Sequence, residues 1–332
     1  MKHIFIINPA AGKENAFEAI KAALEALETS VDYELYQTQG RGDATAFITD
    51  YCRSHAEPVR FYACGGDGTL NEVVNGLVGY PQASLGCYPC GSGNDFVKYY
   101  GGKDSFLNVA ELVAAEEEEI DLIRVGSKYA INAAHFGFDS CVAQVMTNVR
   151  RKKIIGGRNA YTTGILVGLV KAMKNACRVT VDGELINPKG HILLCTLANG
   201  QYVGGSFRCA PRSLDNDGLL EVCLVHPVSH FTFARFVGGY TKGEHLDDPK
   251  FAPYVEYRRG KTITVEAPDG FVYALDGELI EGNRFTVEVV PRAIRLAVPA
   301  SAKPLIGEAH EAQKRANGGA EVVQAVGLEE KI

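Results

Sequence analysis

The stretch that decides the fold is residues 65–76, Gly65-Gly66-Asp67-Gly68-Thr69-Leu70-Asn71-Glu72-Val73-Val74-Asn75-Gly76. Residues 59–64 before it, Val-Arg-Phe-Tyr-Ala-Cys, are rich in β-branched and aromatic side chains and predict a buried strand. Apolar side chains then recur at helical spacing, at Leu70, Val73, Val74 and Leu77. The glycines are therefore predicted to form the turn between a strand and a helix.

Such a turn is a natural anion-binding site. The first amides of a helix have no partner inside it, the helix dipole is positive there, and glycine has no Cβ to keep a phosphate away. Thr69 and Glu72 have the spacing of a capping box, which we expect at this helix start. Asp67 does not fit a bare phosphate pocket, so it predicts a metal ion, a ribose hydroxyl or a positioning hydrogen bond.

Composition limits the class of protein. A chain of 332 residues predicts two domains or one large one, and a net charge of −6 argues against general nucleic-acid binding. Nine cysteines, an odd number, predict reduced thiols and a cytoplasmic location. The N-terminal residues do not resemble a signal peptide, and no apolar stretch approaches the length of a membrane span.

Residues 1–124 read as repeated strand-turn-helix units, which predict a parallel α/β sheet. We expect strands at residues 3–7, 32–38, 59–64 and 83–88, helices at 16–27, 44–52, 70–77 and 107–115, and a solvated acidic run at 116–119. The turn after the first strand is not a Walker A loop, because Gly12-Lys13 is followed by Glu14. Since ligands collect at the carboxyl ends of parallel strands, the turns after them are predicted to share one pocket.

From about residue 125, strand-like runs separated by Asp-Gly and Gly-Gly turns predict a mostly antiparallel β domain. We expect these strands at residues 129–132, 178–181, 191–197, 219–225, 262–266, 284–289 and 294–298. A helical insertion is expected at about residues 143–174, and a second helix at 231–241. The predicted division is 1–124, then 125–290, then a polar tail at 301–332, and completion of the first domain by about residues 290–300 is left open.

Three ordered segments together resemble the diacylglycerol kinase catalytic-domain superfamily, which includes sphingosine and ceramide kinases and is distantly similar to NAD kinases. They are residues 65–73 of the opening stretch, Asn8-Pro9-Ala10-Ala11-Gly12, and Pro89-x-Gly91-Ser92-Gly93-Asn94-Asp95-Phe96. Further similar segments are Ala198-Asn199-Gly200, Asp217-Gly218-Leu219 and Asp276-Gly277-Glu278. The soluble bacterial diacylglycerol and lipid kinases are the nearest resemblance.

The resemblance implies an α/β nucleotide-binding domain with a parallel sheet, followed by a mostly antiparallel β-sandwich that carries the lipid, with the active site between them. It implies Glu278 as the general base and Asp217 as the ligand of a Mg²⁺ ion, together with backbone carbonyls near Leu214 and Leu219. Asp67, Asp95 and Asp121 match acidic positions linked to that metal or to activity. The implied ATP contacts are Asn8, Pro9, Ala10, Ala11, Gly12, Thr38, Gly65, Gly66, Asp67, Gly68, Thr69, Leu70, Asn71 and Ser92.

The expected function is an ATP- and Mg²⁺-dependent lipid kinase, with diacylglycerol as the first substrate and another lipid alcohol (a sphingoid base, ceramide or phosphatidylglycerol) as the nearest alternative. An NAD kinase and a non-catalytic nucleotide-binding regulator stay open. Asp276-Gly277-Glu278 also reads as a plain hairpin turn, since Asp-Gly favours such turns. Asp182-Gly183-Glu184 has the same three residues and is expected to be a plain turn.

A kinase of membrane lipids without a membrane span needs a way to reach its substrate. The basic run Arg150-Arg151-Lys152-Lys153, with Arg158 nearby, reads either as a solvated face or as an edge that docks on anionic lipid. We therefore expect a cytoplasmic protein in peripheral contact with the membrane and no nucleic-acid partner. A homodimer is left open.

Overall fold

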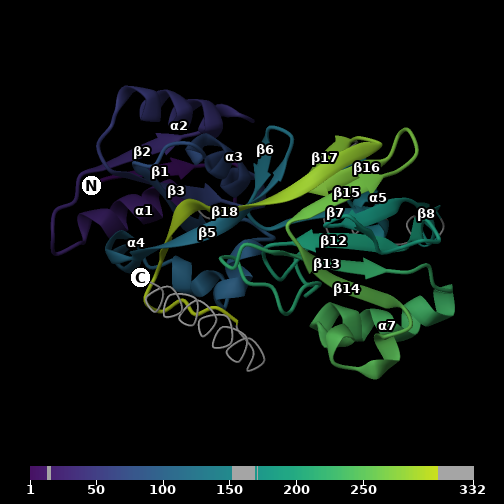
Figure 1. Cartoon of the computed structure of the whole chain (residues 1–332). Helices are drawn as coiled ribbons and strands as arrows, with labels where there is room; N and C mark the ends of the chain where they lie inside the picture. Colours follow the sequence, from purple (N-terminus) through teal and green to yellow (C-terminus); the bar gives the residue numbers. More distant parts are fainter. Residues whose placement is uncertain (13–15, 152–168, 170, 306–332) are drawn as a thin grey trace, which may run out of the picture.

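The computed structural model describes residues 1–12, 16–151, 169 and 171–305. Two lobes lie side by side, and the long strand β18 (Arg284–Val298) runs from one into the other (Figure 1). The N-terminus, labelled N, lies on the side of the N-terminal lobe. The predicted fold class, an α/β lobe followed by an antiparallel β lobe, is confirmed.

The N-terminal lobe is built on four parallel strands in the order β4-β3-β1-β2. Its buried strands are nearly all apolar because helices and loops cover both faces. The elements are β1 (Lys2–Ile7), α1 (Ala16–Glu25), β2 (Tyr33–Gln37), α2 (Asp43–Ser54), β3 (Val59–Gly65), α3 (Asp67–Leu77), β4 (Ala83–Pro89), η1 (Phe96–Tyr100), η2 (Lys103–Phe106) and α4 (Val109–Ala114).

Strand β18 joins the two lobes into one sheet. It pairs in parallel with β4, and antiparallel with β5 (Glu116–Val125) and β15 (Thr262–Glu266). The register with β5 shifts between Val290 and Ile294, where Arg292 has a φ of 50°, so the two strands expected at 284–289 and 294–298 are one irregular strand. The other strands of this sheet are β6 (Lys128–Ala130), β9 (Arg178–Val181) and β10 (Glu184–Leu185).

The C-terminal lobe adds a six-stranded antiparallel sheet in the order β14-β13-β12-β7-β16-β17 within the described ranges. Its inner side chains, such as Phe136 and Leu197, pack against the continuing ten-stranded sheet to form a sandwich. The strands are β7 (Ala133–Gly137), β12 (Leu194–Ala198), β13 (Leu220–Val225), β14 (Val255–Gly260), β16 (Val272–Leu275) and β17 (Glu278–Glu281), and a separate pair is β8 (Asn175–Ala176) with β11 (His191–Ile192).

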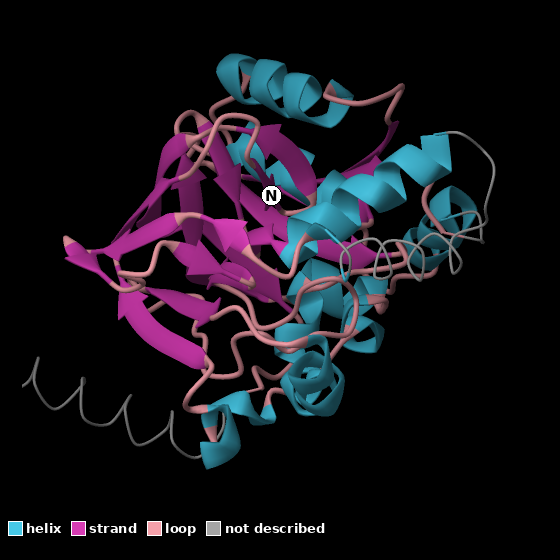
Figure 2. Cartoon of the chain, turned by 90° about the vertical axis from the view of Figure 1, so that its right-hand side faces the viewer, coloured by secondary structure: helices cyan, strands magenta, loops and turns pink. Residues whose placement is uncertain are grey.

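Helices α5 (Phe138–Arg151) and α7 (His230–Lys242) contribute to a third core on the outer face of this antiparallel sheet. In the view of Figure 2 most strands lie to the left and most helices to the right. The short helices η3 (Glu244–Leu246) and η4 (Pro249–Phe251) follow α7. The predicted helix at 231–241 is confirmed, whereas the run Arg150–Lys153 with Arg158 and the tail from 306 lie wholly or largely outside what the structure describes.

Two local expectations are wrong. Helix α3 starts two residues before Thr69, with Gly66 as its N-cap, so Thr69 and Glu72 do not form a capping box. Glu72 instead accepts a hydrogen bond from the backbone N–H of Gly42 at 2.9 Å. The run 116–119 is not uniformly solvated: it begins β5, and the side chain of Glu117 is half-buried.

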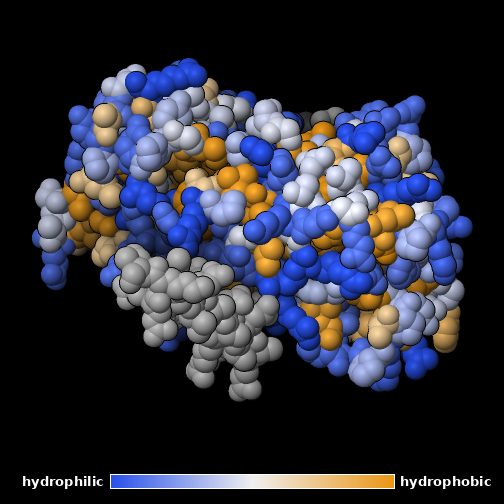
Figure 3. Space-filling model, viewed as in Figure 1, coloured by the Kyte–Doolittle hydropathy of each residue, from blue (hydrophilic) through white to orange (hydrophobic). Residues whose placement is uncertain are grey.

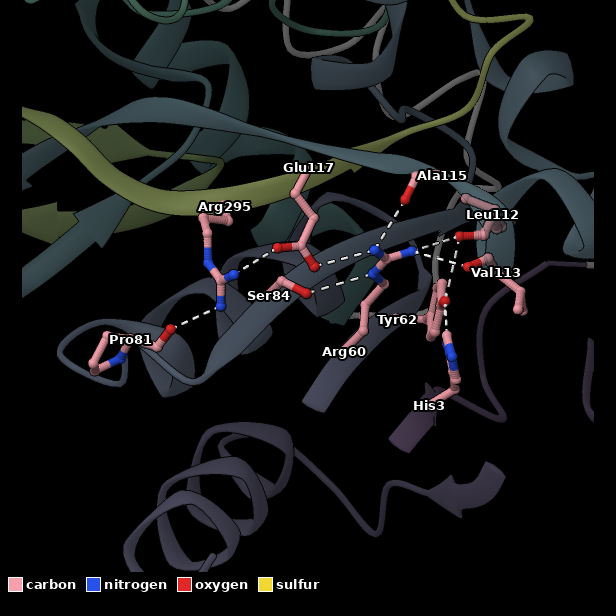
Figure 4. A network of polar contacts seen from close by, with 10 residues as sticks. All are labelled: His3, Arg60, Tyr62, Pro81, Ser84, Leu112, Val113, Ala115, Glu117 and Arg295. Atoms are coloured by element: carbon pink, nitrogen blue, oxygen red, sulfur yellow. Dashed lines mark hydrogen bonds and ion pairs between the residues drawn. The ribbon is translucent and has the colours of Figure 1, made fainter. Parts of the chain in front are cut away.

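Glu117 belongs to a polar network at the amino ends of the strands of the N-terminal sheet (Figure 4). Arg60, which is 4% exposed, donates to Glu117 at 3.1 Å and to the carbonyls of Leu112 and Ala115. Arg295 donates to the other oxygen of Glu117 at 2.7 Å. Because each charge has a partner, this end of the sheet is closed by a satisfied structural network.

Candidate active site

The opposite, carboxyl end of the parallel sheet holds a polar cleft of about 1610 Å³. The turns after β1, β2, β3 and β4 all line it, as the sequence predicted from the sheet topology. Most of the expected ATP contacts lie on its walls: Asn8, Pro9, Ala10, Ala11, Gly12, Thr38, Gly66, Asp67, Gly68, Thr69 and Ser92. The arrangement offers a site for a ligand rich in phosphate oxygens.

Two side chains fix the turns to each other. The Asn8 amide donates to the hydroxyl of Thr69 at 3.1 Å, and its carbonyl oxygen accepts from the backbone N–H of Ala10 at 3.0 Å. Gly91 must be glycine, because a Cβ there would collide with the Cα of Gly66. The two glycine loops can therefore approach closely enough to place the first amides of α3 at the floor of the cleft.

Asp67, in the first turn of α3, holds the loop that follows β4. Its two carboxylate oxygens accept the backbone N–H groups of Asn94, at 2.9 Å, and Asp95, at 2.7 Å. Burial raises the pKa of Asp67, and the nearby Asp95 raises it further, whereas the two N–H bonds lower it. The sequence left three roles open for Asp67, and the positioning hydrogen bond is the one that the structure displays.

Glu278 reaches the same cleft from the other lobe, at the start of β17. One carboxylate oxygen lies 2.6 Å from Nη2 of Arg41, and the other lies 3.8 Å from Nζ of Lys128. The side chain is 27% exposed, so it is open to a substrate. Arg41 follows β2 in the loop Gly40-Arg41-Gly42-Asp43, to which the sequence reasoning gave no role; its place after a parallel strand was the available signal.

Asp276 fixes the turn that carries Glu278. Its carboxylate accepts three backbone N–H groups, from Ile131, Asn132 and Ala133, and the amide of Asn71 on α3 at 3.1 Å. Burial raises its pKa to about 6, although these four bonds favour the ionised form. Asp276 thus ties the Glu278 turn to both lobes, a role the sequence reasoning missed because its partners are far away along the chain.

A second cavity, of about 480 Å³, lies under α7 on the outer face of the antiparallel sheet. Its lining is mostly apolar, with side chains such as Phe138, Leu194 and Phe236. Asp67, Asp276 and Gly277 line this cavity and also the polar cleft. An apolar chain and a phosphate donor bound in the two cavities would therefore meet at these residues.

Three expected ATP contacts do not line the polar cleft. Gly65 ends the buried strand β3, Leu70 faces the apolar cavity, and Asn71 binds Asp276. Their assignment as ATP contacts stays a prediction. Gly65, Leu70 and Asn71 lie directly before and after the glycine turn and contribute to its position.

The expected metal ligands Leu214, Asp217 and Leu219 do not line either cavity. One carboxylate oxygen of Asp217 is ion-paired with Nη2 of Arg259, and the other accepts the backbone N–H of Leu219 at 3.1 Å. Arg259 also donates to Glu221 at 2.8 Å. Among the described residues, no group of three or more His, Cys, Asp or Glu side chains is arranged to hold a metal.

Both carboxylate oxygens of Asp217 are therefore already engaged, and a divalent cation there would lie beside the positive charge of Arg259. Asp121 is likewise engaged: it accepts the backbone N–H groups of Gly218, at 2.6 Å, and Arg292, at 2.8 Å. We assign no catalytic step to a metal at this place. The ligand assignment stays a prediction.

Two domain families match the chain. Residues 2–125 match the diacylglycerol kinase catalytic domain, and residues 132–298 match the YegS C-terminal NAD kinase beta sandwich-like domain. The chain is 31% identical over 302 residues to a probable lipid kinase YegS-like protein of Pseudomonas aeruginosa, covering 90% of this chain and 95% of that protein. It is 28% identical over 295 residues to another of Enterobacter sp., covering 87% and 94%.

A solved structure of a diacylglycerol kinase from Bacillus anthracis has the same fold, with a TM-score of 0.66 at 18% identity over 90% of this chain and 97% of that one. Within the described ranges, no helix combines the length and apolar character that crossing a membrane requires.

Proposed function

This chain belongs to the diacylglycerol kinase catalytic-domain family, and we propose that it transfers the γ-phosphate of ATP to the hydroxyl group of diacylglycerol, which gives phosphatidic acid. One observation carries the proposal: a polar cleft lined by glycine turns and an apolar cavity share the residues Asp67, Asp276 and Gly277. A lipid alcohol needs both environments, one for its chains and one for the reaction.

ATP binds in the polar cleft. The amides at the start of α3 and in the turn after β1 donate to its phosphate oxygens, and Arg41 adds a positive charge on the same wall. Mg²⁺ enters with ATP as part of the substrate and neutralises charge on the phosphates. The glycine turns thus position the donor, and positioning is the larger part of phosphoryl-transfer catalysis.

The transfer step needs a base for the lipid hydroxyl. Glu278 takes this proton while the hydroxyl oxygen forms a bond to the γ-phosphorus, and the bond between that phosphorus and the bridging oxygen of ADP breaks. Nη2 of Arg41 and Nζ of Lys128 lie beside the Glu278 carboxylate and hold it at the wall of the cleft. ADP and phosphatidic acid leave, and the Glu278 proton returns to water.

The apolar cavity favours a lipid acceptor over the NAD of an NAD kinase, because a dinucleotide would leave that lining without a partner. Diacylglycerol and the other lipid alcohols share an apolar chain and a reactive hydroxyl group, so the two cavities alone do not choose among them. The purified chain is therefore assayed with γ-labelled ATP against diacylglycerol, a sphingoid base, ceramide, phosphatidylglycerol and NAD.

Labelled phosphatidic acid as the main product supports the proposal. A different labelled lipid would replace diacylglycerol as the substrate but keep the reaction. Tight ATP binding without phosphorylation of any acceptor would overturn the kinase assignment and favour a nucleotide-binding regulator.

A further inference from the structure

Helix α7 forms one wall of the apolar cavity. Its inner face contributes Phe233, Phe236 and Val237 to the cavity wall. Its outer face, at helical spacing, is exposed and consists of Phe231, Ala234, Arg235, Gly238 and Lys242. The molecular surface directly behind the cavity is therefore the outer face of α7.

Phe231 is the most exposed large apolar side chain in the described part of the protein. It is 78% exposed, compared with 55% for Met1 and 40% for Leu185. Phe231 does not belong to the core cluster on which its neighbours Phe233 and Phe236 pack. Single exposed apolar residues are common, so the charge around Phe231 decides what it fits.

The charge on α7 is positive in a chain whose net charge is −6. The helix contains no aspartate or glutamate, and its outer face has Arg235 and Lys242. Lys242 lies 3.8 Å from the exposed Glu244, whereas the Arg235 guanidinium has no ion-pair partner among the described residues and stacks 5.7 Å from the ring centre of Phe236. An exposed aromatic ring near an unpaired cation supplies the two contributions to binding at a membrane surface, which are buried apolar area and attraction to anionic lipid.

We propose that the outer face of α7 docks on an anionic lipid bilayer, with Phe231 at the boundary between head groups and acyl chains and Arg235 at the head groups. This rests on the proposed function, since the docked helix brings the apolar cavity to the surface that holds the lipid. Figure 3 shows hydrophobic and hydrophilic residues interleaved over the region of α7 at lower right. Docking of this surface would give the apolar cavity access to the lipid substrate in the membrane.

The test is co-sedimentation of the full chain with vesicles of phosphatidylcholine alone or mixed with phosphatidylglycerol. We expect binding to the mixed vesicles that weakens with salt. Phe231→Ser should weaken it about 10-fold, because the ring no longer leaves water, and Arg235→Gln about 5-fold. Leu185→Ser, on the distant β9–β10 hairpin, is the matched control and should bind as the wild type does.

The kinase reaction is measured in parallel on a water-soluble short-chain diacylglycerol, which needs no membrane. Phe231→Ser should keep this activity. Vesicle binding that is unchanged in Phe231→Ser, or a self-association lost in that variant, would overturn the proposal, the latter because a second copy of the chain would then be the occupant. Phe231-dependent binding without any short-chain activity would instead keep the docking surface and contradict the proposed function.

Discussion

Two hairpins of this protein have the same three letters at their turns. Asp182-Gly183-Glu184 joins β9 to β10, and Asp276-Gly277-Glu278 joins β16 to β17. The φ angles are 47° and 89° in the first turn and 46° and 84° in the second. Positive φ at both central residues of a two-residue loop is the type I′ geometry, which Asp-Gly favours. As turns, the two are the same.

Their surroundings differ in every respect that bears on chemistry. Glu184 is exposed on β10, the edge strand of the ten-stranded sheet, and its carboxylate contacts no described cation. Glu278 lies in the polar cleft with Arg41 and Lys128. Asp182 accepts exposed backbone N–H groups of Lys261 and Thr262, whereas Asp276 is buried at the junction of the lobes. The letters decide the turn, and the place in the fold decides the chemistry.

The largest effect expected from this difference is on turnover. Glu278→Gln keeps the shape of the side chain but removes the base, so the rate of phosphate transfer should fall roughly 10²–10⁴-fold. Glu184→Gln is the matched change and should stay within about twofold of the wild type, because no substrate reaches it. Both are measured with labelled ATP and diacylglycerol in mixed micelles.

The affinity for ATP provides the control for Glu278→Gln, since the glycine turns should bind ATP as before. Equal turnover in the two variants would show that the comparison between the turns has no catalytic meaning.

The aspartates should differ in their effect on stability. Asp276→Asn turns an NH₂ group toward buried N–H donors and should lower the free energy of unfolding by about 3 kcal/mol. Asp182→Asn should cost about 1 kcal/mol or less, because water can bind the exposed N–H groups it releases. Urea unfolding of both variants checks this, and similar losses would mean that burial at the lobe junction adds nothing.

Asp276 should also make the stability depend on pH. Its pKa is about 6 in the folded protein against 3.8 for a free aspartate, so the folded state binds this proton more tightly than the unfolded chain. That stabilisation is complete below about pH 4 and is lost as the pH rises through 6. The gap in unfolding free energy between wild type and Asp276→Asn should therefore shrink from pH 4 to pH 7, by on the order of 1–3 kcal/mol. A gap that widens over this range would contradict the assignment.

The smallest effect is expected at the ion pair of the second turn. Arg41 is 74% exposed, so Arg41→Gln should change the unfolding free energy by no more than about 1 kcal/mol. Arg284→Gln removes the ion pair of a similarly exposed arginine, 76% exposed, with Glu266, and should do the same. Only Arg41→Gln should raise the KM for ATP, by a few-fold, because only Arg41 lines the cleft. A rise in KM for both would point to a general loss of charge.

Sequence reasoning was strongest where the physical cause is local. Gly65–Gly76 predicted its own strand-turn-helix unit, the two Asp-Gly turns predicted hairpins, and β9 and β15 have the expected limits. The convergence of Asn8, Thr69 and Ser92 followed from the rule for parallel sheets. Each of these depends on spacing within a short segment or on topology.

Contacts between distant segments could not be predicted in the same way. The pair of Arg259 with Asp217 spans 42 positions, and the bond from Asn71 to Asp276 spans 205. Glu117 read as solvated because nothing near it in the chain indicates Arg60 or Arg295. Such partners are fixed by which strands neighbour each other after folding, so a single sequence does not contain a local signal for them.

The central claim is that the polar cleft and the apolar cavity form one active site. Val237, on the inner face of α7, lines the apolar cavity away from the glycine turns. Val237→Trp should fill the cavity and reduce phosphorylation of long-chain diacylglycerol at least about 10-fold, while ATP affinity and the thermal unfolding midpoint stay close to the wild type. Full activity on long-chain diacylglycerol with the cavity filled would contradict the claim.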